Sequence, residues 1–296
     1  MAKGALDPDP ASPGLSHGLA VQLYLARKFD RAIEQAHDTL EMDTNFAISY
    51  AVLGEVYLSK GMHLKDAREF TRRAIDNGQR AGEKDAPAAL YFGTSALREA
   101  WFCNTDEARR RASSALKLSS SRDLLYLVAL AFAYAKEDAR AKALADDLAK
   151  SFPEDTIVQF NYLPSVRGKL ALNKGDASAA IEILGPAAPY ELGATRATDM
   201  DWTAMFPVFV RGEAYLALRQ GSKAAAEFQK ILDHRGLVLN QPIGALAHLG
   251  LGRAYVLQGD IPKAKPAYQD FLTLWKDADL DIPVLQQTKA DYAKLQ

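Results

Sequence analysis

Apolar positions recur at helical spacing along the chain, in paired runs separated by a short polar turn. The clearest pair starts at Gly252, which is followed by Tyr255 and a Gly-Asp turn. Small and aromatic residues then return in the second run at Ala264, Tyr268 and Phe271. Apolar residues spaced i, i+3, i+4 are typical of amphipathic helices that pack against one another. The pattern therefore predicts a helical hairpin over about residues 245–278.

The same frame recurs upstream, so the chain is expected to be built from repeats. Gly212 is followed by Ala224, Phe228 and Ile231 in equivalent places. Runs that alternate Val, Ile and Thr with polar residues, as half-buried strands do, are not found, which predicts an all-α fold. The predicted units lie near residues 13–46, 47–80, 89–121, 122–155, 161–194, 205–238 and 245–278.

This register of small and aromatic positions resembles the tetratricopeptide repeat over nearly the whole chain. In such repeats, small residues such as Gly252 and Ala264 let two helices approach, and each hairpin buries its apolar face by stacking on its neighbours. The resemblance implies a right-handed superhelical solenoid of about seven hairpins over residues 13–281. An N-terminal remnant or linker is expected at 1–12, and a C-terminal capping helix at 282–296.

A narrower resemblance covers residues 231–283, together with FPEDT at 152–156 and PYELG at 189–193. These segments are similar to the C-terminal repeat regions of bacterial eukaryotic-like serine/threonine kinases and of winged-helix transcriptional regulators. His234-Arg235-Gly236 is not the kinase H-R-D motif, and Asp270-Phe271-Leu272 is not D-F-G. The resemblance thus implies a sensor or interaction region, whose effector domain we expect to precede the repeats in a longer chain.

Charge and composition narrow the function classes. The chain has 296 residues, 36 Lys+Arg against 37 Asp+Glu and a formal net charge of −1, which argues against a dedicated nucleic-acid surface. No apolar run approaches the ~20 residues of a membrane span, and the N-terminus has no signal-peptide core. A cytoplasmic location is expected; the alternative is the periplasmic portion of a membrane-anchored signalling protein.

Several short segments look like known ligand-binding or catalytic motifs but lack residues that those motifs require. Gly250-x-Gly252 follows a predicted helix rather than a strand, so we expect it to pack helices and not to bind phosphate. The acidic run at 277–281 lacks the glycine and glutamate of an EF-hand. The five histidines lack metal-pair spacing, Cys103 has no activating neighbour, and Arg109-Arg110-Arg111 reads as a solvated helix face. We expect no enzymatic activity, cofactor or metal.

Partner binding is expected on the concave surface, which the first helix of each repeat lines in this family. An aromatic, apolar groove with few charges suits a peptide or protein partner that buries apolar side chains. Packing between repeats is the alternative role for each aromatic residue. The register assigns to the groove Tyr24, Glu55, Leu97, Trp101, Tyr126, Tyr134, Tyr162, Lys169, Phe206, Phe209, Glu213 and Arg253.

These features predict a non-enzymatic interaction scaffold, as the sensor or regulatory region of a bacterial signalling protein. Two other classes remain open. A helical-repeat RNA-binding protein requires a basic concave face, and a small-molecule-sensing domain or an enzyme requires a deep pocket between helices. The sequence also allows a homo-oligomer.

Overall fold

A computed structural model describes residues 12–80, 86–193 and 203–295, and every regular element in these ranges is a helix. The predicted all-α solenoid is confirmed. The predicted remnant at 1–12 lies, apart from Ser12, outside the described residues. The helices are α1 (Pro13–Leu25), α2 (Phe29–Met42), α3 (Ala47–Gly61), α4 (Leu64–Arg80), α5 (Ala86–Trp101), α6 (Thr105–Ala115), α7 (Arg122–Tyr134), α8 (Asp138–Ser151), η2 (Val158–Tyr162), α9 (Leu163–Asn173), α10 (Ala177–Leu184), η3 (Gly185–Tyr190), α11 (Phe206–Ala217), α12 (Gly221–Asp233), α13 (Arg235–Val238), α14 (Ile243–Gln258), α15 (Ile261–Leu274) and α16 (Pro283–Ala293).

Seven antiparallel hairpins follow one another, each turning at a single residue in the left-handed region. In the turns before α10 and α15 that residue is glycine, Gly175 with φ 83° and Gly259 with φ 73°. The next residue, Asp176 or Asp260, caps the second helix by accepting a backbone N–H. In the other five hairpins the turn residue has a side chain and a φ between 57° and 65°: Arg27, Met62, Cys103, Lys136 and Arg219.

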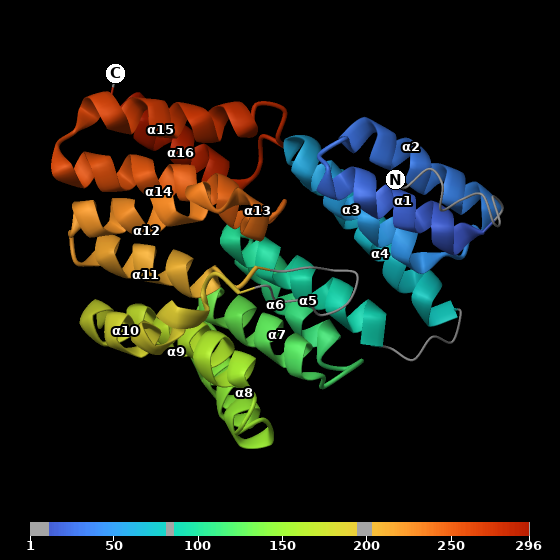
Figure 1. Ribbon diagram of the computed structural model, residues 1–296, viewed down its shortest axis with the longest axis horizontal. Coiled ribbons are helices and arrows are strands. Elements are labelled where there is room, and N and C mark those ends of the chain that lie inside the picture. The colour runs from blue at the N-terminus through green and yellow to red at the C-terminus, as the bar shows by residue number, and fades with distance from the viewer. Residues whose placement is uncertain (1–11, 81–85, 194–202, 296) are drawn as a thin grey trace.

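The chain curves into a ring, so that the segments beside its last hairpin return to its first three hairpins (Figure 1). Arg27 donates a hydrogen bond from Nη2 to the Leu239 carbonyl (3.0 Å), and the Lys65 amide donates to Asp279 Oδ2 (2.8 Å). Phe102 at the end of α5 meets Trp275 edge to face, with ring centroids 5.1 Å apart. These contacts join segments that are far apart in sequence.

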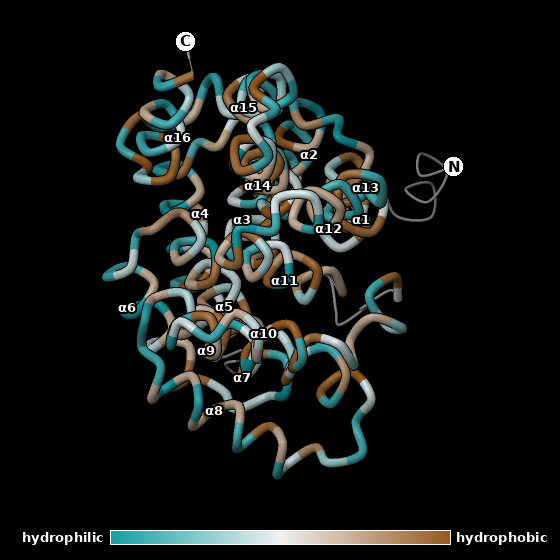
Figure 2. The backbone as a smooth tube through the Cα atoms, turned by 90° about the vertical axis from the view of Figure 1, so that its left-hand side faces the viewer, coloured by the Kyte–Doolittle hydropathy of each residue, from teal (hydrophilic) through white to brown (hydrophobic). Residues whose placement is uncertain are grey.

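Small residues allow close helix crossings in the core. The ring of Phe228 on α12 fills the space beside two glycines, since a Cβ would lie 2.7 Å from it at Gly212 and 2.6 Å at Gly250. Tyr268 occupies the same place beside Gly252 (2.7 Å). The expectation that Gly250-x-Gly252 packs helices is therefore confirmed. Most residues of α6, the second helix of the third hairpin, are hydrophilic (Figure 2).

The C-terminal helix α16 packs against the last hairpin through Val284 and Leu285, which are buried. The sequence did not predict the short helix α13 or the π-helical stretch η2 that leads into α9. Within the irregular segment that the sequence places at 189–204, residues 194–202 lie outside the described part of the chain.

Candidate functional site: two hollows on the inner face

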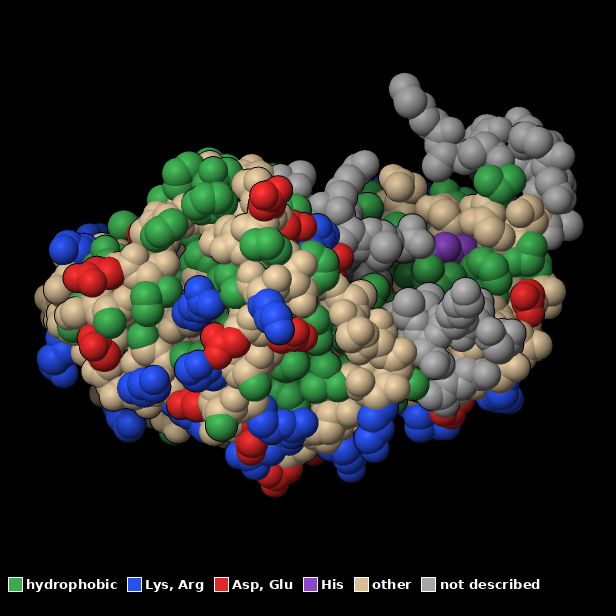
Figure 3. Space-filling view, turned by 90° about the horizontal axis from the view of Figure 1, so that it is seen from below, with side chains coloured by type: hydrophobic (Ala, Val, Ile, Leu, Met, Phe, Trp, Pro, Cys, Tyr) green, Lys and Arg blue, Asp and Glu red, His purple; other side chains and the backbone are tan. Residues whose placement is uncertain are grey.

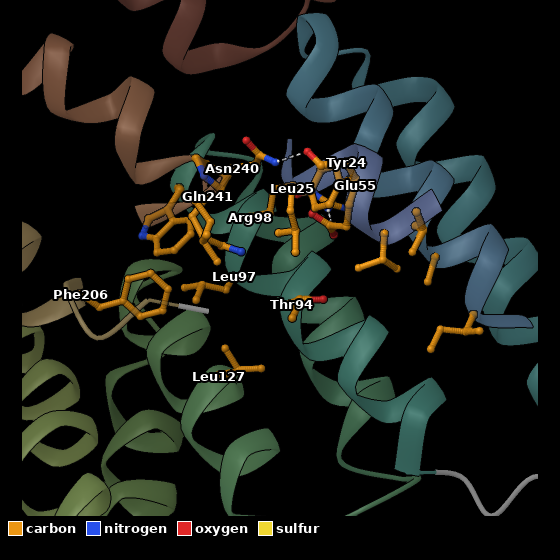
Figure 4. A pocket seen from close by; sticks show the side chains of 17 residues that line it. Tyr24, Leu25, Glu55, Thr94, Leu97, Arg98, Leu127, Phe206, Asn240 and Gln241 are labelled. Carbon is orange, nitrogen blue, oxygen red and sulfur yellow. Dashed lines mark hydrogen bonds and ion pairs between the residues drawn. The ribbon is translucent and has the colours of Figure 1, made fainter. Parts of the chain in front are cut away.

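Ten of the twelve groove positions predicted from the sequence line two of the hollows in the described part of the chain. The first, here called the closure pocket, lies where α1, α3 and α5 meet the segment Leu239–Pro242, and has a cavity volume of about 70 Å³ (Figure 4). Five of the twelve predicted groove residues line it: Tyr24, Glu55, Leu97, Trp101 and Phe206.

An ion pair crosses the closure pocket. Arg98 Nη1 donates to Glu55 Oε1 over 2.9 Å, and these are the two charged residues of its lining. Asn240 Nδ2 donates to the Tyr24 carbonyl over 3.0 Å and so fastens the segment after α13 to α1. Burial, reinforced by the nearby Glu55 carboxylate, raises the pKa of Tyr24 above its ordinary value.

The second hollow, here called the central hollow, has a volume of about 380 Å³ and is bounded by α5, α7, α9, α11, α14 and α16. Six predicted groove residues line it: Trp101, Tyr134, Lys169, Phe209, Glu213 and Arg253. Trp101 belongs to both hollows, because its indole packs edge to face on Phe206 (5.1 Å) and on Tyr134 (6.2 Å).

A polar network occupies the wall of the central hollow. Glu213 Oε2 accepts hydrogen bonds from the Tyr134 hydroxyl (2.8 Å) and from Lys169 Nζ (3.0 Å), and that ammonium lies 4.0 Å from the centre of the Tyr134 ring. Burial, followed by the Glu213 charge, raises the pKa of Tyr134 well above its ordinary value. Arg253 Nη2 lies 3.7 Å from Asp291 of α16, and its side chain is 40% exposed. Arg253 is thus the most exposed charge of this network.

Cys103 is the single cysteine of the chain and also lines the central hollow. It is the left-handed turn residue between α5 and α6 (φ 65°), and it is exposed. Partial desolvation raises the pKa of its thiol above the ordinary value, which lowers the thiolate fraction at pH 7. The thiol is therefore a weak nucleophile that reports on access to the hollow.

The remaining two predicted groove residues lie in the core. Tyr126 is fully buried and stacks on Tyr162, with ring centroids 3.8 Å apart and planes 3° from parallel. The Tyr162 hydroxyl donates to Asp123 Oδ1 (2.8 Å). In this structure both rings pack between repeats, the alternative role that the sequence left open for aromatic positions.

The other sequence candidates lie in structural contacts. Within the acidic run, Asp279 accepts the Lys65 amide and Asp281 pairs with Lys65 Nζ (3.4 Å), so both acids contact α4 across the closure of the ring. Burial lowers the pKa of His248, which lies 3.5 Å from Asp270. In the described ranges no three His, Cys, Asp or Glu side chains come together as a metal site. The three consecutive arginines pair with Asp106, Glu107 and Glu137.

Sequence reasoning missed two parts of the inner face. Arg98 follows Leu97 directly, but the repeat register assigns only the latter to the groove. Segment Leu239–Pro242 closes the first pocket, although it lies between two repeat units. The register carries no signal for this segment, because its contacts with Tyr24 and Arg27 depend on the meeting of parts of the chain that are far apart in sequence.

A tetratricopeptide repeat model matches residues 209–279, which include α12, α14 and α15. These residues are therefore similar to tetratricopeptide repeats. No helix in the described ranges combines the length and apolarity that a bilayer crossing requires. No curated protein matches the chain.

Two solved structures share the fold of tetratricopeptide arrays with this chain. The crystal structure of yeast Tom70 is 15% identical with a TM-score of 0.53, and the match covers 99% of this chain and 57% of that one. The hetero-tetramer Cut9-Hcn1 of the APC/C is 17% identical with a TM-score of 0.55, covering 97% of this chain and 51% of that one. The chain thus spans about half the length of these structures, and at such identities the likeness concerns the fold alone.

Proposed function

We propose that this chain is a non-enzymatic scaffold that binds a peptide segment of a protein partner in the central hollow. One observation carries the proposal: six side chains from the inner helices, three aromatic and three charged, share one hollow of about 380 Å³. Interaction sites in proteins combine an apolar, aromatic centre with polar groups that fix orientation. The central hollow offers both.

The charges of the hollow favour a particular kind of segment. Lys169 and Glu213 already satisfy one another at 3.0 Å, whereas Arg253 is only loosely paired with Asp291 at 3.7 Å. Arg253 can therefore donate to a carboxylate or carbonyl of a partner while apolar side chains pack on Trp101 and Phe209. We infer a segment with an apolar anchor next to an acidic or carbonyl-rich stretch.

Similarity of fold supports this function by analogy. Cut9 is described in a hetero-tetramer with Hcn1, so an array with this fold takes part in a protein assembly. The resemblance of residues 231–283 to the repeat regions of bacterial kinases and winged-helix regulators supports a regulatory role in bacterial signalling. We also propose a cytoplasmic location, with the periplasmic portion of a membrane-anchored signalling protein as the alternative.

An RNA-binding function is the less favoured candidate. Lys and Arg are interspersed with Asp and Glu on the face seen in Figure 3, and the net charge is −1. RNA recognition instead needs a continuous basic surface whose affinity falls steeply with salt. A salt-dependent shift of labelled RNA would favour this candidate, and no shift at low salt would dismiss it.

Arg253→Glu tests the proposed site. A peptide selected on the wild-type chain from a random library is expected to bind this variant about tenfold more weakly, because a favourable charge becomes repulsive. The measurement is fluorescence polarisation of the labelled peptide at constant ionic strength.

Arg167→Glu is the matched control. Arg167 is 44% exposed and lies 3.9 Å from Asp146, so its pairing resembles that of Arg253, but it is outside both hollows. Its variant is expected to bind the peptide within about twofold of the wild type, since weakly paired surface charges contribute little. Equal affinities of the two variants would contradict the assignment of the peptide to the central hollow.

A further inference from the structure

A third hollow, here called the seam hollow, lies where the turn after α1 and helix α3 meet α12, α13, α14 and α15. Its volume is about 460 Å³. It shares Glu55 and the segment Leu239–Pro242 with the closure pocket, and none of its lining residues lines the central hollow. Ligand pockets in proteins have volumes of about 300–1,000 Å³, so the seam hollow has room for a small organic molecule.

Two arginines that are far apart in sequence line this hollow. Arg27 is the turn residue between α1 and α2, and Arg235 is the first residue of α13. Arg27 Nη2 donates to the Leu239 carbonyl over 3.0 Å, and its Nε and Nη1 have no partner in the described ranges. The Arg235 guanidinium forms no hydrogen bond or ion pair with a described residue. Both arginines are exposed, so a ligand in the hollow can reach their donors.

The positive charge of these arginines is not balanced inside the seam hollow. Burial lowers the pKa of Arg27, and the charge of Arg235 lowers it further, so the two guanidinium groups repel one another. Two acids also line the hollow. Glu55 is engaged by Arg98 over 2.9 Å, and the Asp270 side chain is 62% exposed to water. Neither acid pairs with Arg27 or Arg235, so an anion bound between the two arginines relieves their repulsion.

A dianionic group matches two guanidinium groups better than a monoanion does. A carboxylate or a sulfate ester carries one negative charge, which leaves one of the two guanidinium charges unneutralised. A phosphate monoester carries about −1.5 to −2 charges at pH 7 and has three acceptor oxygens. Arginine binds phosphate through two parallel N–H donors, so one phosphate can accept hydrogen bonds from both Arg27 and Arg235.

The wall beside the arginines is apolar and sets the character of the rest of the ligand. Leu58 and Met62 line it from the α3 side, and Val238 and Leu274 line it from the opposite side. Leu58, Met62 and Val238 are buried, whereas Leu274 is 50% exposed. An apolar group attached to the phosphate would cover Leu274 and release water from it, which favours binding.

We propose that the seam hollow binds a small phosphate monoester whose organic group is apolar. The phosphate accepts hydrogen bonds from Arg27 and Arg235, and the organic group packs on Met62 and Leu274. The ligand then connects the first hairpin to α13 and stabilises the closed ring. This function goes beyond the proposed peptide binding, because the central hollow and the seam hollow have no lining residue in common.

Isothermal titration calorimetry of the full chain with phenyl phosphate, at low and constant ionic strength, tests the proposal. We expect one binding site. Phenyl sulfate has nearly the same shape but one negative charge, and it is expected to bind at least about tenfold more weakly. Inorganic phosphate keeps the charge but lacks the ring, and it is expected to bind about tenfold more weakly, because the apolar contact is lost.

Variants locate the site. Arg235→Gln removes a guanidinium that has no partner among the described residues, and we expect it to weaken phenyl phosphate at least about tenfold with the fold unchanged. Arg27→Gln is expected to weaken it equally, but it also loses the hydrogen bond to Leu239. Arg219→Gln is the matched control, because Arg219 is likewise an exposed turn residue (φ 57°) and lies outside the seam hollow. We expect its affinity to stay within about twofold of the wild type.

Three results would each overturn the proposal. They are the absence of heat with millimolar phenyl phosphate, equal affinities for phenyl phosphate and phenyl sulfate, and equal affinities of Arg235→Gln and Arg219→Gln for phenyl phosphate. Circular dichroism of each variant establishes that it is folded. If Arg27→Gln alters the fold, Arg235→Gln and the three-ligand comparison on the wild-type chain decide the outcome.

Discussion

Replacing Phe228 with alanine is expected to lower the free energy of unfolding by about 3–5 kcal/mol, the range for a buried phenylalanine. Phe228 is 1% exposed and lies against both Gly212 and Gly250, so its ring joins two consecutive hairpins. It also meets Phe209 edge to face, at 5.8 Å between centroids. The glycines have no side chains that could refill the space, so the cavity remains. Urea titration followed by circular dichroism measures the change.

Phe160→Ala provides the control for this substitution. Phe160 is 37% exposed and stacks on Tyr190 at 4.9 Å, so its removal opens no enclosed cavity. We expect a loss of about 1 kcal/mol or less. If the two alanine variants were equally stable, Phe228 would not be the packing element between these hairpins.

Arg68→Met is expected to destabilise the fold by about 3–5 kcal/mol at pH 7, the cost of breaking a buried ion pair from one side. Glu99 is fully buried, and both of its oxygens accept from Arg68 at 2.7 Å. Without Arg68, the described residues leave its carboxylate one hydrogen bond, from Asn104 Nδ2 (2.9 Å). The free energy of unfolding from urea titration again gives the magnitude.

Two further variants distinguish the cost of an unpaired buried carboxylate from the effect of removing an exposed arginine. Arg72→Met lies on the same helix and removes ion pairs to Glu69 and Asp76, but the side chain is 59% exposed, so we expect no measurable change. Combining Arg68→Met with Glu99→Leu removes both charges and is expected to recover most of the lost stability. A double variant as unstable as Arg68→Met alone would refute the explanation by an unpaired buried carboxylate.

The sequence predicted the repeats because their packing is local. Gly212, Gly252 and the aromatic residues beside them lie within one hairpin or its neighbour, so their spacing along the chain reflects their contacts. Six of the side chains that this register assigns to the groove line the central hollow, since inner helices of consecutive repeats share one face.

Features that depend on ring closure were beyond that reasoning. The distance from Lys65 to Asp279 along the chain spans most of the repeats, and no repeat pattern encodes which ends meet. The closure pocket follows from this meeting, because Leu239–Pro242 form one of its walls. The register also does not show which inner-face residues contact each other. It places Tyr126 and Tyr162 on the inner side, but their stacking on one another is visible only in the structure.

Chemical modification of Cys103 gives the most direct test of partner binding in the central hollow. As the single cysteine of the chain, exposed and on the wall of the hollow, it yields an unambiguous signal with N-ethylmaleimide. With the selected peptide at ten times its dissociation constant, we expect the modification rate to fall about tenfold, since about a tenth of the sites remain free. An unchanged rate at that saturation would contradict binding in the central hollow.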